Sequence, residues 1–323
     1  MKKALITGIT GQDGAYLSKL LLDKGYSVVG TSRTAKPDTW RLKALGIEKN
    51  IMLEACDLMD ADKVSDLIKS IKPDEIYNLA AQSSVNKSFA DPKTTIRENI
   101  ISLLNILEAV RTADKKTASK KIRLYQAGTS EMYGPKAKLP ITEQSPLDPI
   151  SPYGASKAAC HLLAKSYRDT YGLFISNGIL FNHESSFRSP DYFIRRLIRT
   201  ARAISKGSDD YVYLGQADNK KDFGYAPDYV EAMWLMLQQK KPKDYIVCSG
   251  ISISIRDITE YVLKHFKVSK TRIKIDKKLF RSPNVTDMYG DNTLAKKELN
   301  WKNQGDFFKT LDLMIENEIK NEK

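Results

Sequence analysis

The chain has 323 residues, of which 41% are hydrophobic, and a formal net charge of +13. This length and composition can bury a large core, and no stretch approaches the roughly 20 apolar residues that a membrane-spanning helix needs. The lysines and arginines are spread along the chain beside acids, without an aromatic-and-basic motif, which argues against a nucleic-acid-binding protein and against a membrane protein.

Short apolar segments alternate with amphipathic segments through the first half of the chain. We predict strands at residues 3–7, 27–32, 51–54, 75–78, 122–127 and 174–179, and helices at residues 14–24, 61–71, 94–111 and 152–171. This βαβα order is typical of a Rossmann-type doubly wound α/β fold, a parallel sheet with helices on both faces.

The alternation becomes less regular after residue 179. We predict helices at residues 192–206, 227–237 and 255–266, loops at residues 184–190, 215–224 and 281–291, and a last sheet strand near residues 244–247. The chain is therefore expected to form a nucleotide-binding Rossmann domain over residues 1–179, completed by that late strand. Residues 180–323 are expected to form mainly a smaller, interleaved α/β lobe that binds the substrate, with a cleft between the two.

A glycine-rich turn follows the first predicted strand and opens the first helix. Its glycines have the spacing G-x-x-G-x-x-G, which permits a tight turn and lets a pyrophosphate approach the backbone and the N–H groups of the helix N-terminus. In this strand–turn–helix context the pattern predicts a dinucleotide site. The site comprises Gly8, Thr10, Gly11, Gln12, Asp13 and Gly14.

The end of the second predicted strand selects between dinucleotides. Sites that prefer NAD usually carry an acid there for the ribose 2′-hydroxyl, whereas this chain has Ser32 and Arg33, which suit the 2′-phosphate of NADP. The alternative is that Arg33 is an ordinary surface residue. Further contacts are expected from Asp57 and Leu58 at the adenine, and from Leu79, Ala80 and Ala81 along the middle of the cofactor.

Tyr153 and Lys157 lie one turn apart on a predicted helix and so share a face. A phenol of pKa near 10 is a weak base at neutral pH, but a neighbouring ammonium and a positive nicotinamide ring would lower that pKa. The pair could then accept a proton from a sugar hydroxyl while hydride leaves its carbon. An isolated Y-x-x-x-K can be an ordinary helix pair; downstream of the glycine motif, catalysis is the better interpretation.

Thr129, Ser130 and Glu131 follow the predicted strand at residues 122–127, at the edge of the sheet where ligands bind. Hydride transfer needs only a hydroxyl here, so Glu131 supplies a second base. Such a base can remove the acidic proton beside a new ketone, after which water leaves the next carbon. The alternative is that Glu131 caps the following turn.

At these residues the chain resembles the extended short-chain dehydrogenase/reductase family and, within it, the GDP-mannose 4,6-dehydratase family. The matching segments are residues 4–14, 128–134, 151–157, 180–185 and 223–234, and the resemblance extends from residue 2 to about residue 301. It implies that Tyr153, Lys157 and Thr129 deprotonate the sugar 4-hydroxyl as hydride passes from C4 to NADP⁺. Glu131 would remove the C5 proton, and water would leave C6 with help from Ser130 or Glu131. Return of the hydride to C6 would regenerate the cofactor, which should stay bound.

The same resemblance implies contacts with the GDP-sugar from Ser83, Ser84, Asn182, Arg188, Arg196, Lys221 and Arg281. The chain also departs from the family at several points. Ser84 stands where the mannose enzymes usually carry histidine, Lys221 replaces an arginine and Asn284 replaces an acid. The segment at residues 185–192 differs in length by one residue, and the loop after Arg33 is shorter. The hexose is therefore left open between GDP-mannose, GDP-heptose and GDP-N-acetylglucosamine, of which we favour the last.

The sequence leaves two other functions as alternatives. A reductase or epimerase acting on a GDP-4-keto-6-deoxy sugar would not need Glu131, and a redox sensor or scaffold would need no catalytic tyrosine. The family resemblance implies a homodimer or homotetramer through the helices at residues 94–111 and 152–171. The widely separated Cys56, Cys160 and Cys248 indicate free thiols, no metal site and a reducing cytoplasm, and His183 is assigned a structural role.

Overall fold

The computed structural model describes residues 1–116, 121–280 and 284–320. The strands are β1 (Lys3–Thr7), β2 (Ser27–Ser32), β3 (Ile51–Ala55), β4 (Glu75–Asn78), β5 (Arg123–Ala127), β6 (Phe174–Leu180), β7 (Asn182–Glu184), β8 (Val212–Leu214), β9 (Lys220–Tyr225), β10 (Tyr245–Val247), β11 (Ser252–Ser254) and β12 (Ile273–Ile275). The α-helices are α1 (Gln12–Asp23), α2 (Trp40–Ala44), α3 (Ala61–Ile71), α4 (Val85–Ala90), α5 (Pro92–Lys116), α6 (Pro152–Tyr171), α7 (Phe193–Ser205), α8 (Ala226–Gln238), α9 (Ile255–His265), α10 (Thr293–Leu299) and α11 (Phe307–Lys320). Short 3₁₀ helices are η1 (Glu48–Asn50), η2 (Ser130–Met132), η3 (Lys270–Arg272) and η4 (Lys277–Leu279).

The centre of the molecule is a seven-stranded sheet in the order β10-β6-β5-β4-β1-β2-β3. All six strand pairs are parallel. Each connection must therefore return from the carboxyl end of one strand to the amino end of the next strand. The predicted Rossmann-type α/β fold is confirmed. The late strand expected near residues 244–247 is β10, which pairs with β6.

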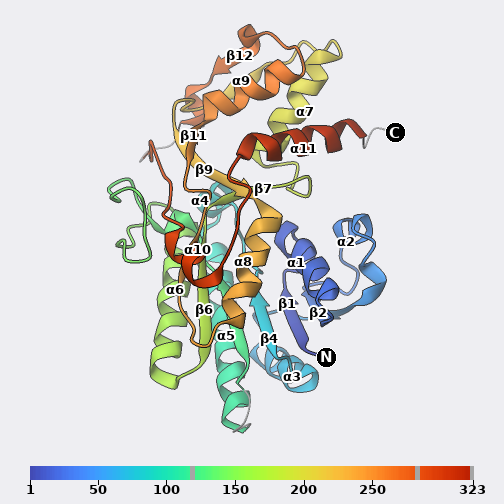
Figure 1. The fold of residues 1–323 in the computed structure, drawn as a ribbon, viewed down its shortest axis with the longest axis vertical. Coiled ribbons are helices and arrows are strands. Elements are labelled where there is room, and N and C mark those ends of the chain that lie inside the picture. The colour runs from blue at the N-terminus through green and yellow to red at the C-terminus, as the bar shows by residue number, and fades with distance from the viewer. Residues whose placement is uncertain (117–120, 281–283, 321–323) are drawn as a thin grey trace.

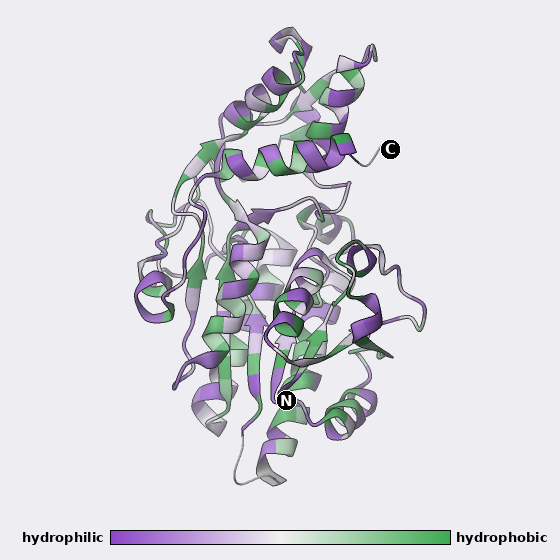
Figure 2. Ribbon diagram, turned by 45° about the vertical axis from the view of Figure 1, so that its right-hand side comes forward, coloured by the Kyte–Doolittle hydropathy of each residue, from purple (hydrophilic) through white to green (hydrophobic). Residues whose placement is uncertain are grey.

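Alternate residues of the central strands face opposite layers of helices. In β1, Ala4 and Ile6 belong to the core cluster that contains α1 and α8, whereas Leu5 belongs to the cluster that contains α3, α5 and α6. The central strands are apolar on both faces, because both faces are covered. Hydrophobic residues follow the central strands and the sheet-facing sides of the helices in Figure 2.

A smaller lobe lies beyond the carboxyl ends of the central strands (Figure 1). It contains a three-stranded sheet in the order β11-β9-β7, the parallel pair β12-β8, and the helices α7, α9 and α11 around their own core. Within the described residues, no helix is both long and apolar enough to cross a bilayer.

The second half of the chain also contributes to the core of the large domain. α8 packs against α1, and its Tyr229 and Met233 are fully buried there. The loop predicted at residues 215–224 is wrong over its second half, which forms most of β9. Its Lys220 and Lys221 give no apolar alternation, and the strand forms because β7 and β11 pair with it from distant parts of the chain.

Candidate active site

The carboxyl ends of the parallel strands meet at one edge of the sheet, below the smaller lobe. Gly8 follows β1, Leu79 follows β4 and Gly128 follows β5 at that edge. In open α/β sheets this edge is where ligands bind. The residues that the sequence assigns to cofactor and catalysis therefore come from different strands of one sheet but lie at one edge.

The glycine loop of residues 8–14 is too closely packed for a Cβ atom at Gly8 or at Gly14. Gly8 has φ of +70°, and a Cβ there would lie 2.9 Å from the Ala80 nitrogen; a Cβ at Gly14 would lie 2.6 Å from the Gly8 carbonyl oxygen. The N-cap residue of α1, Gly11, makes no side-chain cap hydrogen bond. The first N–H groups of α1 are thus left for a ligand, which fits a dinucleotide pyrophosphate.

A chain of buried polar side chains, which the sequence analysis missed, supports this loop from below. The Thr7 hydroxyl donates to Asn78 Oδ1 at 2.7 Å and accepts from the Leu79 and Ala80 N–H groups at 3.1 Å. Asn78 Nδ2 donates to Gln126 Oε1 at 2.7 Å. Each residue ends a neighbouring strand, so only the strand order could have shown that they form one network.

The expected adenosine-binding residues lie at the neighbouring strand ends. Arg33 is 74% exposed, and its Nη1 lies 3.4 Å from Glu98 Oε1 on α5, so its guanidinium is accessible to a ligand. Ser32 Oγ accepts a hydrogen bond from the Thr34 N–H at 3.3 Å. Leu58 is buried and its carbonyl accepts from Asn105 Nδ2, while Asp57 Oδ1 accepts from the Met59 N–H.

The expected catalytic pair is carried by the first two turns of α6. Ser151 caps this helix by accepting from the Gly154 N–H at 3.0 Å, and Pro152 occupies its first turn. Tyr153 is 7% exposed and Lys157 is 5% exposed. Lys157 Nζ donates to the Ala127 carbonyl at 2.8 Å, which anchors the ammonium to the end of β5.

The protein surroundings shift the pKa of both residues. Burial raises the pKa of Tyr153, although a hydrogen bond with Thr129 and the charge of Arg188 act in the opposite direction. Burial also lowers the pKa of Lys157, whose ammonium is directed to a carbonyl. That a neighbouring ammonium and a bound, positive nicotinamide ring together lower the phenol pKa stays a prediction.

Thr129 and Glu131 lie beside Tyr153, as their position after β5 predicts. Thr129 caps η2 by accepting from the Glu131 N–H at 3.3 Å, so the cap of this turn is the threonine and not the glutamate. The Glu131 charge contributes to raising the pKa of Tyr153, which places a carboxylate near the phenol. Ser130 is buried in the same turn.

Asn99 on α5 is a second feature that the sequence analysis missed. Its side chain exchanges hydrogen bonds with the Gln82 backbone, accepting from the N–H at 2.9 Å and donating to the carbonyl at 3.2 Å. Its Nδ2 also lies 2.9 Å from Ser156 Oγ on α6, to which it donates. Asn99 therefore links the catalytic helix to the segment after β4 that borders the cleft.

The expected substrate contacts come from both lobes. The hydroxyls of Ser83 and Tyr192 lie 3.0 Å apart and join the two lobes, and Ser84 caps α4. Asn182 Nδ2 donates to the Asp222 carbonyl at 3.2 Å. Arg196 is exposed on α7 and Lys221 lies in β9, whereas Arg281 lies outside the described residues.

Arg188 lies deeper than a surface contact with a diphosphate would require. Its Nε lies 3.4 Å from Glu184 Oε1, and its guanidinium lies 3.8 Å from the Tyr192 ring centre. Its charge acts on both Tyr153 and Asp13, so it lies between the catalytic helix and the glycine loop. Among the described residues, Arg188 Nε and Glu184 Oε2 are buried without a hydrogen-bond partner.

An ion pair joins the glycine loop to the substrate side of the cleft. His183 Nε2 lies 3.0 Å from Asp13 Oδ2, its Nδ1 lies 2.7 Å from the Phe181 carbonyl, and its ring stacks on Tyr229. Burial lowers the pKa of His183, but the charge and hydrogen bond of Asp13 raise it by more, so the net shift is upward. Burial raises the pKa of Asp13, and His183 more than offsets this, so that pKa is lowered.

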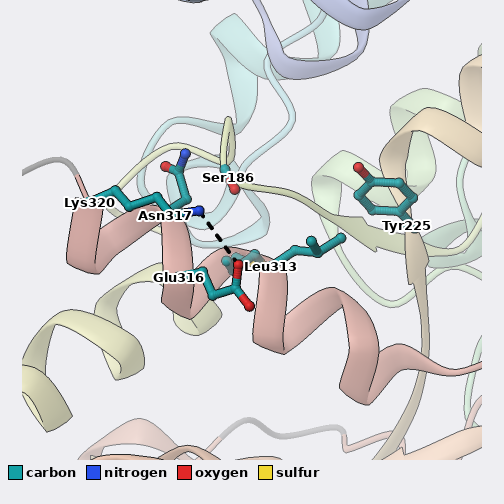
Figure 3. A pocket seen from close by; sticks show the side chains of 7 residues that line it. Ser186, Tyr225, Leu313, Glu316, Asn317 and Lys320 are labelled. Atoms are coloured by element: carbon teal, nitrogen blue, oxygen red, sulfur yellow. Dashed lines mark ion pairs between the residues drawn. The ribbon is translucent and has the colours of Figure 1, made fainter.

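A separate cavity of about 220 Å³ lies between α11 and the chain at Ser186 and Tyr225 (Figure 3). It is lined by Ser186, Tyr225, Leu313, Met314, Glu316, Asn317 and Lys320. None of the expected catalytic residues borders it. Over residues 1–116, 121–280 and 284–320, no three histidine, cysteine, aspartate or glutamate side chains are grouped so as to hold a metal ion.

Comparison with known proteins identifies close relatives over nearly the whole chain. The family described as GDP-mannose 4,6 dehydratase matches residues 5–314. GDP-mannose 4,6 dehydratase 1 of Arabidopsis thaliana is 40% identical over 98% of this chain and 90% of its own length. The human GDP-mannose 4,6 dehydratase is 39% identical over 93% of this chain and 86% of its own length.

Solved structures share the fold at lower sequence identity. The UDP-glucose 4-epimerase of Thermotoga maritima superposes with a TM-score of 0.87 at 21% identity, over 99% of this chain and 100% of that chain. The dTDP-glucose 4,6-dehydratase of Streptomyces venezuelae also superposes with a TM-score of 0.87, at 22% identity, over 99% of this chain and 97% of that chain. At this identity, these structures establish the architecture only.

The Asp13–His183 pair predicts a pH-dependent contribution to stability. The raised pKa of His183 means that its contribution is complete below its ordinary value of 6.5 and is lost as the pH rises through the folded-state pKa. The lowered pKa of Asp13 means that its contribution is present above 3.8 and is lost as the pH falls through the folded-state pKa. Glu184, Arg188 and Tyr229 also face the imidazole.

We expect Asp13→Asn to lower the free energy of unfolding by about 1.5–3 kcal/mol at pH 6, because a charge-assisted hydrogen bond is lost. The difference from wild type should be smaller at pH 9 than at pH 6, because the contribution of the pair is lost as the pH rises through the raised pKa of His183. Urea unfolding at the two pH values measures both differences. A difference that is the same at pH 6 and pH 9 would show that the pair is not ionic.

Proposed function

The chain belongs to the GDP-mannose 4,6-dehydratase family, and on that premise we propose that it is an NADP-dependent 4,6-dehydratase of a GDP-linked hexose. The observation that carries the proposal is the position of Glu131 beside Tyr153 and Thr129 at the carboxyl edge of the sheet. A reductase would need the tyrosine and the hydroxyl but not the second carboxylate. The product would be the GDP-4-keto-6-deoxy sugar and one water.

The first step is removal of the proton from the sugar 4-hydroxyl. Tyr153 accepts this proton, and the Thr129 hydroxyl holds the phenol in place. When bound, a nicotinamide would supply positive charge that favours phenolate and would carry the hydride between C4 and C6. Lys157, anchored on the Ala127 carbonyl, keeps a cation one turn from the phenol.

The second step is loss of water across C5 and C6. Oxidation at C4 makes the C5 proton acidic, and Glu131 removes it. The C6 hydroxyl then leaves as water, taking one proton from Glu131 or Ser130. One hydride returned to C6 and one proton returned to C5 complete the 6-deoxy sugar, so the reaction consumes no oxidant or reductant.

We propose NADP as the nicotinamide cofactor. A dinucleotide is supported by the glycine loop, which Cβ atoms would obstruct, and by the uncapped N-terminus of α1. The dTDP-glucose 4,6-dehydratase of the same fold was crystallised with NAD. The exposed guanidinium of Arg33 at the end of β2, with no acid at positions 32 and 33, favours a ribose 2′-phosphate instead of a 2′-hydroxyl.

We propose a GDP-sugar as the substrate because the relatives that span nearly the whole chain are named for GDP-mannose. Within that class, GDP-N-acetylglucosamine is our first candidate. Ser84 caps α4 next to the Ser83–Tyr192 contact, where the mannose enzymes that the chain resembles carry a larger histidine. A smaller side chain at this point supports a hexose with a larger substituent.

The buried free thiols fit the predicted cytoplasmic location.

Mass spectrometry of GDP-sugars tests the proposed function. GDP-N-acetylglucosamine, GDP-mannose and a GDP-heptose are each incubated with the protein and a catalytic amount of NADP⁺. We expect one of them to lose the mass of one water without net consumption of the cofactor. If no sugar loses water, and NADPH is oxidised only when a 4-keto sugar is supplied, the protein is a reductase.

Glu131→Gln separates the two chemical steps. We expect this variant to oxidise C4 but to lose water at least about 10²-fold more slowly, because the base for the C5 proton is missing. Quenched reactions should contain a 4-keto hexose that keeps its C6 hydroxyl, and in D₂O no deuterium should enter C5. Tyr153→Phe, as the control, should form no keto sugar. Unimpaired water loss by Glu131→Gln would remove Glu131 from the mechanism.

We also propose that the chain forms a homodimer through α5 and α6, or a tetramer built from such dimers. The exposed faces of α4, α5 and α6 carry Phe89, Ile96 and Leu162, which are 55%, 41% and 56% exposed. We expect Leu162→Lys to shift the sedimentation coefficient toward that of the monomer. Met52→Lys, at a methionine that is 58% exposed on β3, is the control and should leave the assembly unchanged.

A further inference from the structure

Residues 183–188, the bridging segment, border the path between the glycine loop and the catalytic helix. His183 contacts Asp13 at the first turn of α1, and the charge of Arg188 acts on both Asp13 and Tyr153. A dinucleotide whose pyrophosphate lies at α1 and whose nicotinamide lies near Tyr153 must pass along this segment. Release of the dinucleotide therefore depends on how firmly the segment is held to the glycine loop.

Gln12 and Asp13 hold the first half of the bridging segment. In addition to the Asp13–His183 ion pair, Gln12 Nε2 donates to the His183 carbonyl at 3.2 Å. The Ser185 hydroxyl donates to Gln12 Oε1 at 2.7 Å and accepts from the Phe187 N–H at 3.0 Å. These contacts come from two consecutive residues of the glycine loop.

Arg41 holds the second half, from a helix that the sequence did not predict. Its Nε donates to the Phe187 carbonyl at 2.7 Å, and its Nη1 donates to the Thr10 carbonyl at 3.0 Å. One planar guanidinium thus joins the bridging segment to the glycine loop. The guanidinium lies 4.5 Å from the Trp40 ring centre, which fixes its orientation.

The Phe187 side chain is held beside Arg41 by two aromatic rings. It stacks on Tyr16 of α1 with ring centres 4.8 Å apart, and the edge contact with Trp40 of α2 measures 5.4 Å. The neighbouring Ser186 borders the cavity of about 220 Å³ (Figure 3), and its carbonyl accepts from Arg195 Nη1 at 2.6 Å. Arg195 thus holds Ser186, while Arg41 joins Phe187 to the glycine loop.

Arg41 makes no salt bridge: among the described residues it forms no ion pair with a carboxylate within 4.0 Å. Burial lowers the pKa of Arg41, the charge of Asp38 raises it, and the charges of Arg195 and Arg188 lower it, so that the net shift is downward. A partly buried cation beside the glycine loop is favourable when an anionic diphosphate lies at the same loop.

We propose that Arg41 is a positioning residue that holds the bridging segment on the glycine loop and thereby slows the release of NADP(H). The inference rests on the proposed function in one respect, namely that a dinucleotide binds at the glycine loop. In a reaction that regenerates its cofactor in every cycle, slow release costs no turnover. Retention instead prevents loss of the reduced cofactor while the sugar is a keto intermediate.

The test measures the release of NADPH from the purified protein. NADPH-loaded protein is mixed with excess NADP⁺, and the fall in NADPH fluorescence gives the dissociation rate. We expect Arg41→Ala to release NADPH about 10–100-fold faster than wild type, because two hydrogen bonds of about 0.5–1.5 kcal/mol each are lost. Arg41→Lys keeps the charge but reaches one carbonyl at a time, so its rate should be intermediate.

Lys43→Ala provides the matched control, because Lys43 is a cation on the same helix whose side chain is 63% exposed. This variant should release NADPH at the wild-type rate. At saturating NADP⁺, the kcat of Arg41→Ala should stay within about threefold of wild type, while half-saturation requires more NADP⁺.

Release by Arg41→Ala and Arg41→Lys within twofold of wild type would overturn the inference. The same holds if kcat at saturating NADP⁺ falls with no change in release. If Arg41→Ala does not fold, Arg41→Lys alone decides. The fluorescence assay needs no sugar substrate, so failure of the proposed dehydratase reaction would appear separately, as retained NADPH binding without water loss from any GDP-sugar.

Discussion

The parallel pairing of the central strands is the constraint on which the rest of the structure depends. Because every strand of the seven-stranded sheet runs in the same direction, all of their carboxyl ends lie at one edge. Residues as distant in sequence as Gly8 and Lys157 are brought to that edge by the same pairing. The edge leaves backbone groups and loop residues without sheet partners, and the smaller lobe covers it to form the cleft.

The site is rigid because polar groups are buried in connected sets. Thr7, Asn78 and Gln126 form one chain beneath the glycine loop, and Asn99 links α6 to Gln82. Each such buried hydrogen bond contributes about 0.5–1.5 kcal/mol, but removing one partner leaves the other unsatisfied and costs more. These uncharged networks hold the ends of β1, β4 and β5, the segment at Gln82 and the helix α6 in fixed positions relative to one another.

Charged side chains are concentrated in and around the bridging segment. His183 and Arg188 are paired with Asp13 and Glu184, whereas Arg41 is bound to two carbonyl groups. This group of charged residues suits phosphate-bearing ligands, because the negative charges of the phosphates complement the cations. Burial is the main reason why the pKa of Tyr153 is raised, and the charge of Glu131 adds to it, whereas the Thr129 hydrogen bond and the charge of Arg188 lower it.

The sequence by itself determined the sheet, the glycine loop and the catalytic helix, because these depend on local patterns. Apolar periodicity identifies strands and helices, glycines mark a turn that Cβ atoms would obstruct, and a spacing of four places Tyr153 and Lys157 on one face. The position after the predicted strand at residues 122–127 also singled out Thr129, Ser130 and Glu131, and the family resemblance suggested their individual roles, which are proposals.

Only the tertiary structure decided the features that depend on contacts between distant segments. β9 forms by pairing with β7 and β11 although Lys220 and Lys221 show no strand pattern, and α2 is too short for periodicity to reveal. The Lys157 contact with Ala127 and the Arg41 contacts with Thr10 and Phe187 join residues with no pattern in common. Desolvation acts in the same way, since the pKa of Tyr153 depends on what the whole fold buries around it.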